Sequence, residues 1–467
     1  MQKGGRKKMR IVVKIVKWLL GLVVLAIAAL FAWLYFAPPE LIRVGSGYSA
    51  KIVCSNVFIA GRDADDVLAV DVQAPGHPLL RLMRVSVDKE KGTVSAGLFG
   101  VFGRTVAVAR DGLGCAAVPD GNIAAAKTIT GAALTPAPPP EALWPEGDRL
   151  DPSQNPEIAD ILDDAALTGS GMRAVVAVKN GRIVAERYGA GFSQKTPLLG
   201  WSMTKTVNAA IVGTVVKDGK MAVANQGLFG SWKADGRAAI SLADMMAMSS
   251  GLEFNEDYGD VADVTRMLYL EPDMAVFAES KPLTGDVGKV FSYSSGTAVM
   301  LSRLWQDAIG DKDKALAWPR VALFNPLGMQ SAVLEADEHG TFVGSSYLYA
   351  TARDWARFGL FLLQDGVWNG KEILPAGFVG WMREQAPTTK VYGKGQLWIE
   401  APGDEESPGA GVAAGLPGDT YWMEGHDGQT VAIIPSEKLV VVRLGLTPAK
   451  LGYRPQTMVA ALVKALH

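Results

Sequence analysis

Cysteine and histidine are scarce in this chain, which has two Cys and four His among 467 residues. The four histidines (His77, His339, His426 and His467) are scattered and lack the spacing of a zinc site, so we expect no metal. The chain is too long for a peptide, a toxin or a single small module. With 49% hydrophobic residues, it can form a core of several hundred residues.

Net charge is almost absent, because 46 Lys and Arg residues stand against 48 Asp and Glu residues. Seven of the basic residues, and none of the acidic ones, lie in the first 39 positions, so the rest of the chain has a net charge of −9. Affinity for nucleic acid depends on clustered cations. The mildly acidic body therefore excludes nucleic acid as a partner.

One long apolar run is present near the start of the chain. Residues 18–37 are 20 uncharged and almost wholly apolar residues, which as a helix span roughly 30 Å, the thickness of a bilayer core. A cleaved signal peptide is the alternative, but it has a shorter apolar stretch and a small-residue cleavage site, which Phe36-Ala37-Pro38-Pro39 does not provide. Because basic flanks stay in the cytoplasm, we expect residues 1–17 to be cytoplasmic and the body to be periplasmic or extracellular.

Composition divides the remaining chain into three parts. Residues 40–133 form an N-terminal extramembrane segment, residues 134–150 a Pro-rich linker, and residues 151–467 the main domain. Both cysteines, Cys54 and Cys115, lie in the first part. In an oxidising compartment they can form a structural disulfide, and two buried thiols are the alternative.

Strand signals lie at both ends of the main domain, and helix signals lie between them. Asn180-Gly181 predicts a tight hairpin, and a second hairpin is predicted around residues 435–438. We therefore expect an α/β fold of the α+β type, with one antiparallel sheet formed by both ends of the domain, flanking helices and a mostly helical insertion. Helices are predicted at Met203–Lys217, Leu242–Met248, Thr351–Leu363 and Gln456–Leu466.

Ser202-Met-Thr-Lys205 lies at the start of the first predicted helix. Residues three apart share a helix face, so the hydroxyl and the amine are within contact range. A lysine whose pKa is lowered by burial can take the serine proton and make the oxygen a nucleophile. The pattern is not specific by itself, because Ser86-Val-Asp-Lys89 has the same spacing in a strand and turn.

Two later motifs add groups of the kind that acyl transfer requires. Tyr293, in a loop of small residues that enters a helix, can relay a proton between nucleophile and leaving group. Gly425-His426-Asp427-Gly428-Gln429 precedes a strand, where backbone N–H groups can face a developing oxyanion. Taken singly, the tyrosine has the alternative of a packing residue, and the glycine motif that of a plain turn.

In this order, Ser202-x-x-Lys205, Tyr293-Ser-Ser295 and His426-Asp-Gly428 resemble the motifs of the penicillin-recognising serine hydrolases. That family includes class C β-lactamases, D-amino-acid peptidases, family VIII esterases and 6-aminohexanoate-dimer hydrolases. The stretch Glu253–Tyr258 is most similar to the 6-aminohexanoate-dimer hydrolase branch. The resemblance covers residues 150–467, about two thirds of the chain.

The resemblance implies a role for each matching residue. Ser202 is the expected nucleophile, Lys205 its base, and Tyr293 the group that passes the proton to the leaving amine or alkoxide. The backbone N–H groups of Ser202 and Gln429 are the expected oxyanion hole. The expected substrate-binding residues are Tyr258, Ser295, His426 and Gly428. This chemistry requires no cofactor.

Two departures from the β-lactamase pattern bear on the substrate. Ser295 stands where those enzymes usually have Asn, and His426 stands where they usually have Lys. A neutral imidazole binds the β-lactam carboxylate less well than a permanent cation. We therefore expect little β-lactamase activity.

The hypothesis that follows is a membrane-anchored serine hydrolase that cleaves linear amide or ester bonds through an acyl-serine intermediate. The alternatives are a D-amino-acid peptidase or weak β-lactamase acting on cell-wall-type substrates, and an inactive envelope binding module. The expected partners are a small amide, ester or peptide substrate and the membrane. The sequence leaves the physiological substrate and the oligomeric state open, and residues 40–133 are a spacer, a lid or a docking surface.

Overall fold

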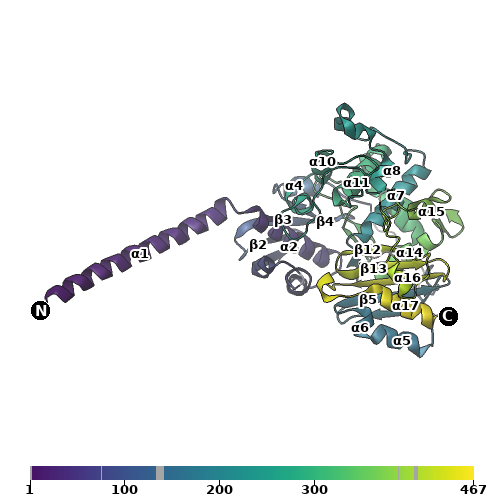
Figure 1. Cartoon of the computed structure of the whole chain (residues 1–467), viewed down its shortest axis with the longest axis horizontal. Helices are drawn as coiled ribbons and strands as arrows, with labels where there is room; N and C mark the ends of the chain where they lie inside the picture. The colour runs from purple at the N-terminus through teal and green to yellow at the C-terminus, as the bar shows by residue number, and fades with distance from the viewer. Residues whose placement is uncertain (1–2, 75, 133–140, 388, 404–408) are drawn as a thin grey trace.

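The computed structural model describes residues 3–74, 76–132, 141–387, 389–403 and 409–467. The first part of the predicted linker at 134–150 lies outside the described residues. The long helix α1 (Lys3–Phe36) projects away from the globular part of the molecule (Figure 1). Its portion Met9–Phe36 is long and apolar enough to cross a membrane, and none of it is buried in the protein. This helix contains nearly all of the predicted anchor at 18–37.

The segment after α1 forms a helix packed on a small sheet. Helix α2 (Glu40–Phe58) begins directly after Pro39 and is buried along most of its length. It contacts a four-stranded antiparallel sheet in the order β1-β2-β3-β4. The strands are β1 (Met83–Asp88), β2 (Thr93–Leu98), β3 (Phe102–Arg110) and β4 (Gly114–Val118); the helices are α3 (Ala64–Val67), η1 (Leu68–Gln73), η2 (Pro78–Leu82) and α4 (Ile123–Lys127).

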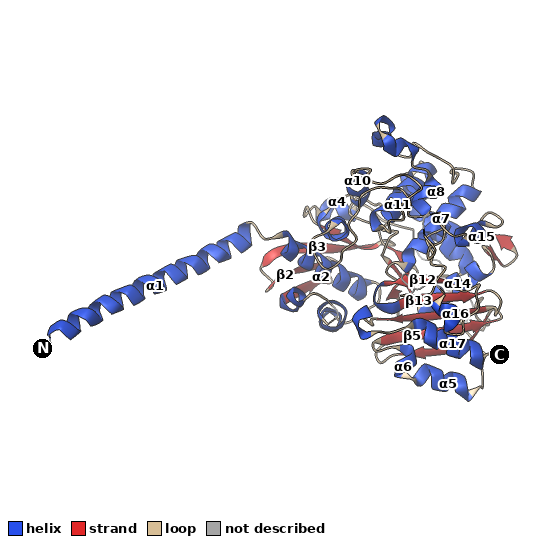
Figure 2. Ribbon diagram, in the orientation of Figure 1, coloured by secondary structure: helices blue, strands red, loops and turns tan. Residues whose placement is uncertain are grey.

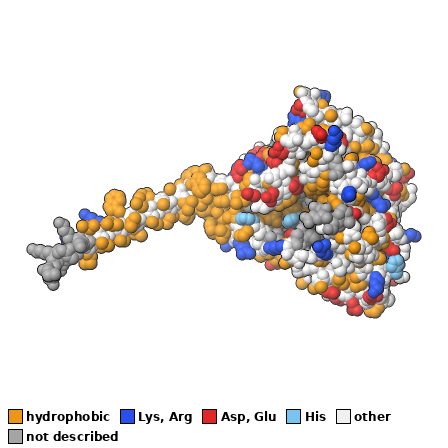
Figure 3. Space-filling model, in the orientation of Figure 1, with side chains coloured by type: hydrophobic (Ala, Val, Ile, Leu, Met, Phe, Trp, Pro, Cys, Tyr) orange, Lys and Arg blue, Asp and Glu red, His pale blue; other side chains and the backbone are white. Residues whose placement is uncertain are grey.

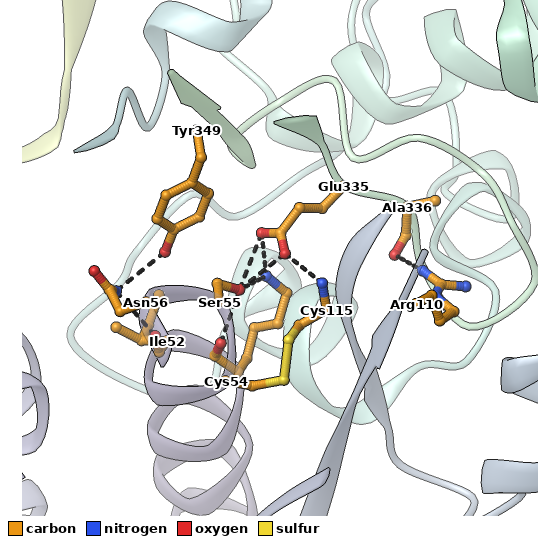
Figure 4. The surroundings of a disulfide bond; sticks show 10 residues. Ile52, Cys54, Ser55, Asn56, Arg110, Cys115, Glu335, Ala336 and Tyr349 are labelled. Carbon is orange, nitrogen blue, oxygen red and sulfur yellow. Dashed lines mark hydrogen bonds and ion pairs between the residues drawn. A yellow bond between two sulfur atoms is a disulfide. The ribbon is translucent and has the colours of Figure 1, made fainter. Parts of the chain in front are cut away.

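A disulfide joins this helix to this sheet, because Cys54 of α2 is bonded to Cys115 of β4. Beside it, Glu335 reaches from the main domain toward the same helix, as Figure 4 shows. The Glu335 carboxylate accepts hydrogen bonds from the Ser55 hydroxyl at 2.9 Å and from the Cys115 backbone N–H at 2.5 Å. It also forms an ion pair with Lys51 at 2.5 Å, in which both side chains are almost fully buried.

Further polar contacts bind the N-terminal segment to the main domain. Asp71 accepts a hydrogen bond from Arg173 at 2.6 Å, and Arg110 donates to the backbone oxygens of Ala336 and Asp337. Since these groups are buried, each requires its partner to offset the loss of hydration. The segment therefore packs as a fixed part of the globular structure.

The central sheet confirms the expectation that both ends of the main domain form one antiparallel sheet. Its order is β12-β13-β14-β5-β6, so the C-terminal strand β14 pairs with the N-terminal strand β5. Figure 2 draws the strands of this sheet in red and labels β12, β13 and β5. The two predicted hairpins are the pairs β5-β6 and β13-β14 of this sheet. The bounds are β5 (Met172–Lys179), β6 (Arg182–Tyr188), β12 (Tyr421–Gly425), β13 (Gln429–Ile434) and β14 (Leu439–Gly445).

Both faces of this sheet are buried, which explains the almost continuous apolar sequence of its central strands. In β5, Val175 and Ala177 belong to one hydrophobic cluster, and Val176 and Val178 belong to another. Alternate side chains of a strand point to opposite faces, so two layers of helices cover the sheet. One layer contains α14 (Ala352–Leu363), and the other contains α5 (Pro156–Asp163), α6 (Ala165–Thr168) and α17 (Pro455–Ala465).

The insertion between β6 and β12 is mostly helical, as expected. Its central helix α7 (Met203–Lys217) has the predicted bounds and is buried on nearly all sides. The other helices are η3 (Gly230–Ala234), η4 (Gly236–Ala239), α8 (Leu242–Met246), α9 (Asp263–Leu270), α10 (Met274–Glu279), α11 (Ser295–Ile309), α12 (Lys312–Trp318), η5 (Pro319–Phe324), α13 (Asn325–Leu327), α15 (Phe378–Arg383) and α16 (Ala410–Ala413). Short strands are β7 (Leu198–Leu199), β8 (Val333–Leu334), β9 (Leu348–Ala350), β10 (Val367–Trp368) and β11 (Lys371–Glu372); η6 (His426–Gly428) and η7 (Ala449–Leu451) follow.

Candidate active site

Ser202 occupies the turn that leads from β7 into α7. Trp201 before it has a positive φ of 49°, a backbone conformation that is uncommon for a large side chain and often marks a functional turn. Two glycines make room for this turn. A Cβ at Gly200 would lie 2.2 Å from the Trp355 ring, and a Cβ at Gly425 would lie 2.2 Å from the Gly200 carbonyl oxygen. The turn is therefore pressed between α14 and the end of β12.

Lys205 lies one helical turn after Ser202, as the spacing predicts. Its Nζ donates to Ser202 Oγ at 3.1 Å, to Ser295 Oγ at 3.1 Å and to the Ser345 carbonyl oxygen at 3.0 Å. The side chain is 1% exposed. Burial lowers the pKa of Lys205 to about 8, against an opposing effect of the Glu256 carboxylate. A neutral amine beside the serine hydroxyl is therefore accessible near neutral pH.

Tyr293 lies against the same lysine. Lys205 Nζ is 4.6 Å from the centre of the Tyr293 ring. Burial, followed by the neighbouring phenol of Tyr392, raises the pKa of Tyr293 well above its usual value, whereas a hydrogen bond with the Ser202 side chain lowers it. The ring is held between Tyr392, edge-on at 5.9 Å, and Trp398, stacked at 5.7 Å. The alcohol, the amine and the phenol thus converge from separate parts of the chain.

Glu256 also belongs to this cluster, although sequence reasoning did not single it out. Its carboxylate accepts the Ser295 backbone N–H at 2.9 Å and also the Ser295 hydroxyl. Tyr258 OH lies 3.4 Å from both Glu256 and Ser295 Oγ. The position of Glu256 two residues before Tyr258 is the feature of the sequence that points to it, but a glutamate in a polar loop is usually exposed to solvent. Nothing in the sequence indicates that the Ser345 carbonyl oxygen contacts Lys205.

The motif that begins at His426 lies beside the serine turn. The His426 ring stacks on Tyr258 at 6.1 Å and meets Trp201 edge-on at 5.7 Å. Gly428 packs apart from these rings, and its carbonyl oxygen accepts a hydrogen bond from Arg443 at 3.0 Å. Its φ of 82° lies in the region that favours glycine.

Gln429 is the first residue of β13 and pairs with Gly425, which lies against the Gly200 carbonyl. The segments that carry the Ser202 and Gln429 backbone N–H groups are therefore neighbours. The Gln429 side chain points elsewhere, because both of its polar atoms bind the backbone of Gly445. Any role of Gln429 in catalysis would therefore belong to its main chain, which is the role that the family resemblance implies. Within the described parts of the chain, no group of three or more His, Cys, Asp and Glu residues could hold a metal ion.

Comparison with known proteins gives concordant matches. The sequence model of the family described as Beta-lactamase matches residues 165–454. The 6-aminohexanoate-dimer hydrolase of Paenarthrobacter ureafaciens is 24% identical over 307 residues, which cover 59% of this chain and 72% of that protein.

Two solved structures share the fold. The first is a Bacillus anthracis protein assigned by name to the 6-aminohexanoate-dimer hydrolases, with a TM-score of 0.55, 22% identity, and coverage of 71% of this chain and 88% of that one. The second is a family VIII carboxylesterase, with a TM-score of 0.51, 13% identity, and coverage of 68% and 98%. The residues matched by the family model, 165–454, include Ser202, Lys205 and Tyr293.

Proposed function

The chain belongs to the beta-lactamase family, and on this basis we propose that it is a membrane-anchored hydrolase that cleaves linear amide or ester bonds through acyl-Ser202. The family match and the related hydrolase make the protein a serine hydrolase. We propose, in addition to this family membership, the catalytic residues, the type of bond that is cleaved and the membrane anchor. Helix α1 supplies the anchor, and its basic flank favours a periplasmic or extracellular body.

The mechanism begins with proton transfer from Ser202 Oγ to the neutral amine of Lys205. The oxygen attacks the substrate carbonyl carbon. The backbone N–H groups of Ser202 and Gln429 donate hydrogen bonds that stabilise the oxyanion of the tetrahedral intermediate. Tyr293 donates a proton to the leaving amine or alkoxide and regains one through Lys205. Water then attacks the acyl-Ser202 ester by the reverse proton path, which releases the acid and the free serine.

The observation that carries this proposal is the environment of Lys205. Three hydrogen bonds hold its Nζ, one of them at 3.1 Å to Ser202 Oγ. Burial lowers its pKa to about 8. A general base works best when its pKa is near the working pH, and a lysine with an ordinary pKa of about 10.4 would be protonated almost completely.

The charges of the site favour a neutral substrate. Ser295 is hydrogen-bonded to the carboxylate of Glu256. Negative charge therefore lies next to position 295, where β-lactamases usually have the side-chain amide of an Asn. His426, whose side chain is 57% exposed, replaces the permanent cation. A substrate carboxylate would meet repulsion from Glu256, and position 426 supplies no permanent cation to offset it. This arrangement supports uncharged esters and amides over β-lactams and over D-amino-acid peptides with a free terminal carboxylate.

Labelling with a fluorophosphonate tests the nucleophile directly. We expect a single adduct on Ser202 and no adduct in Ser202→Ala. The second Ser-x-x-Lys pattern provides a matched control, because Ser86→Ala removes an exposed serine in β1 and should leave the labelling unchanged. Labelling at another residue, or none in the folded protein, would overturn the proposed mechanism.

A substrate panel tests the bond and the substrate class. Turnover of short acyl esters and linear amides is expected to exceed that of D-Ala-D-Ala peptides and of nitrocefin. A preference for the D-Ala-D-Ala peptides would instead support the peptidase alternative. A protein that labels at Ser202 and cleaves none of the four would contradict the proposed substrate class while leaving the nucleophile intact.

A further inference from the structure

A cavity of about 430 Å³ lies beside the Ser202 turn, between the N-terminal segment and the main domain. One wall comes from α2 and η2 and includes Leu41, Val44, Leu79 and Leu80. The opposite wall includes Trp201 and Tyr258. Its volume is within the ~300–1,000 Å³ of typical small-molecule sites, and apolar side chains predominate in such sites.

We propose that this cavity binds the apolar acyl chain of the substrate, so that the protein is selective for long-chain esters or amides. This inference rests on the proposed function of Ser202. Among the described residues that line the cavity, none is Lys or Arg, and Asp260 is the one carboxylate. A substrate carboxylate would therefore lose its hydration there without gaining an ion pair with a Lys or Arg side chain. An alkyl chain loses only its contact with water, which is favourable.

The wall of the cavity that includes Trp201 and Tyr258 leads to the reactive groups. Trp201 immediately precedes Ser202 in the chain. Tyr258 lines the cavity and places its OH 3.4 Å from Ser295 Oγ, which in turn contacts Lys205 Nζ at 3.1 Å. A chain lying against Trp201 and Tyr258 would thus extend toward the carbonyl carbon that Ser202 attacks.

The contacts around the cavity make it a pre-formed one. A Cβ at Gly47 would lie 2.8 Å from Tyr269 Cβ, so the glycine lets α2 lie directly against α9. The rings of Tyr48 and Tyr269 meet edge-on at 5.7 Å, and Tyr269 accepts a hydrogen bond from Tyr347 at 3.1 Å. A pre-formed site binds its ligand with less loss of conformational entropy.

The position of the cavity suits an acyl chain that enters from a membrane. Only three residues separate the end of α1 from the start of α2, and Leu41 lies in the first turn of α2. The β2–β3 turn near α1 exposes Phe99 and Val101, which are 56% and 49% exposed. In Figure 3, the hydrophobic surface of α1 continues toward a hollow of the globular part where further hydrophobic side chains gather.

A chain-length series tests the proposal on the full chain in phosphatidylcholine nanodiscs. We expect kcat/KM to rise about fourfold for each buried methylene from p-nitrophenyl acetate to the octanoate, until the cavity is full. Leu79→Trp fills the cavity and should reduce the octanoate-to-acetate ratio at least tenfold. Leu451→Trp is the matched control, because Leu451 is 58% exposed and does not line the cavity.

Partition of the longer esters into the discs is the same for both variants, so it cancels when their ratios are compared. A flat series in the wild-type protein, or equal ratios in Leu79→Trp and Leu451→Trp, would overturn the cavity assignment. If Ser202 is still labelled by the fluorophosphonate in that case, the proposed function stands and only this inference fails.

A second measurement does not depend on turnover. In Ser202→Ala protein, an octyl amide with a terminal diazirine is photolysed, and the labelled peptides are identified by mass spectrometry. Labelling of the peptides that hold Leu41 or Leu79, suppressed by octanamide and not by acetamide, would support the cavity. Labelling confined to α1 would overturn it.

The same discs show whether the acyl chain belongs to a membrane lipid or to a water-soluble ester or amide. Release of fatty acid from the disc lipids by wild-type protein, and not by Ser202→Ala, would identify a membrane lipid as the source. Chain-length-dependent turnover of soluble esters without that release would identify a water-soluble ester or amide. Both results support an acyl-chain site, and the absence of both contradicts it.

Discussion

Glu256 accepts the backbone N–H of Ser295 at 2.9 Å, while the Ser295 hydroxyl donates to the same carboxylate and receives a hydrogen bond from Lys205. A buried amine and a carboxylate are therefore joined through one hydroxyl. The carboxylate raises the pKa of Lys205, against the larger lowering by burial. Glu256 thus influences the pH at which the proposed base loses its proton.

Replacement of Glu256 by Gln is expected to move the pH profile toward lower pH. The active form of Lys205 is the neutral amine, so the rate rises as pH increases through its pKa. Without the carboxylate the pKa falls further, and the rising limb of kcat/KM for an acetate ester should shift in the acid direction. Glu253→Gln, an exposed change in the same loop, is the control and should keep the wild-type profile. A shift to higher pH in Glu256→Gln would contradict this account.

Lys205→Ala is expected to reduce kcat by about 10²–10⁴-fold for an ester substrate, because the proton acceptor is lost. In wild-type protein the rising limb should have its midpoint near pH 8, the pKa to which burial lowers Lys205. Lys89→Ala provides the matched control in the second Ser-x-x-Lys pattern. Near-normal turnover by folded Lys205→Ala protein would show that another group is the base.

Tyr293→Phe separates the proton donor from the packing role of the ring. The phenyl ring keeps the contacts with Tyr392 and Trp398, but it cannot protonate a leaving group. The loss in kcat/KM should be large for an amide, whose amine must be protonated to leave, and smaller for a p-nitrophenyl ester, whose phenolate leaves readily. Equal losses for both substrates would indicate a structural effect. Tyr188→Phe, a change in β6 outside the site, serves as the control.

How much of the site could be predicted depends on the distance between its residues along the chain. Ser202 and Lys205 are three residues apart on a helix, so local geometry was sufficient to pair them. Tyr293 was placed by family resemblance, since it lies 88 residues after Lys205 along the chain and local geometry does not pair them. Glu256 was not predicted, because nothing in a polar loop indicates that its carboxylate will turn toward Ser295.

The central sheet was predicted well, whereas the packing of the N-terminal segment against the main domain was not. Two hairpin signals and the apolar strands were sufficient for the central sheet, because turns and period-two patterns are local. The packing of residues 40–133 against the main domain depends on contacts such as Lys51 with Glu335, which are 284 residues apart. Apolar side chains such as Leu41 and Leu79 look like ordinary core residues in the sequence, so the cavity had no local signal.

Glu335→Gln tests whether the N-terminal segment depends on its buried ion pair. Lys51 would lose the carboxylate that offsets its burial, and a broken buried pair typically costs about 3–5 kcal/mol in the free energy of unfolding. Glu146→Gln, which breaks a half-exposed pair with Arg182, should cost at most about 1 kcal/mol. Denaturant unfolding of the full chain compares the two variants.

The pH dependence distinguishes lost charge pairing from a change of packing. Burial lowers the pKa of Lys51, and Glu335 partly restores it. In Glu335→Gln the pKa of folded Lys51 falls further below its unfolded value, so the unfolded state binds more protons over a wider pH range. Stability should therefore rise with pH over that range more than in the wild-type protein. Parallel pH curves for the two proteins would show that the ion pair is not the cause of the destabilisation.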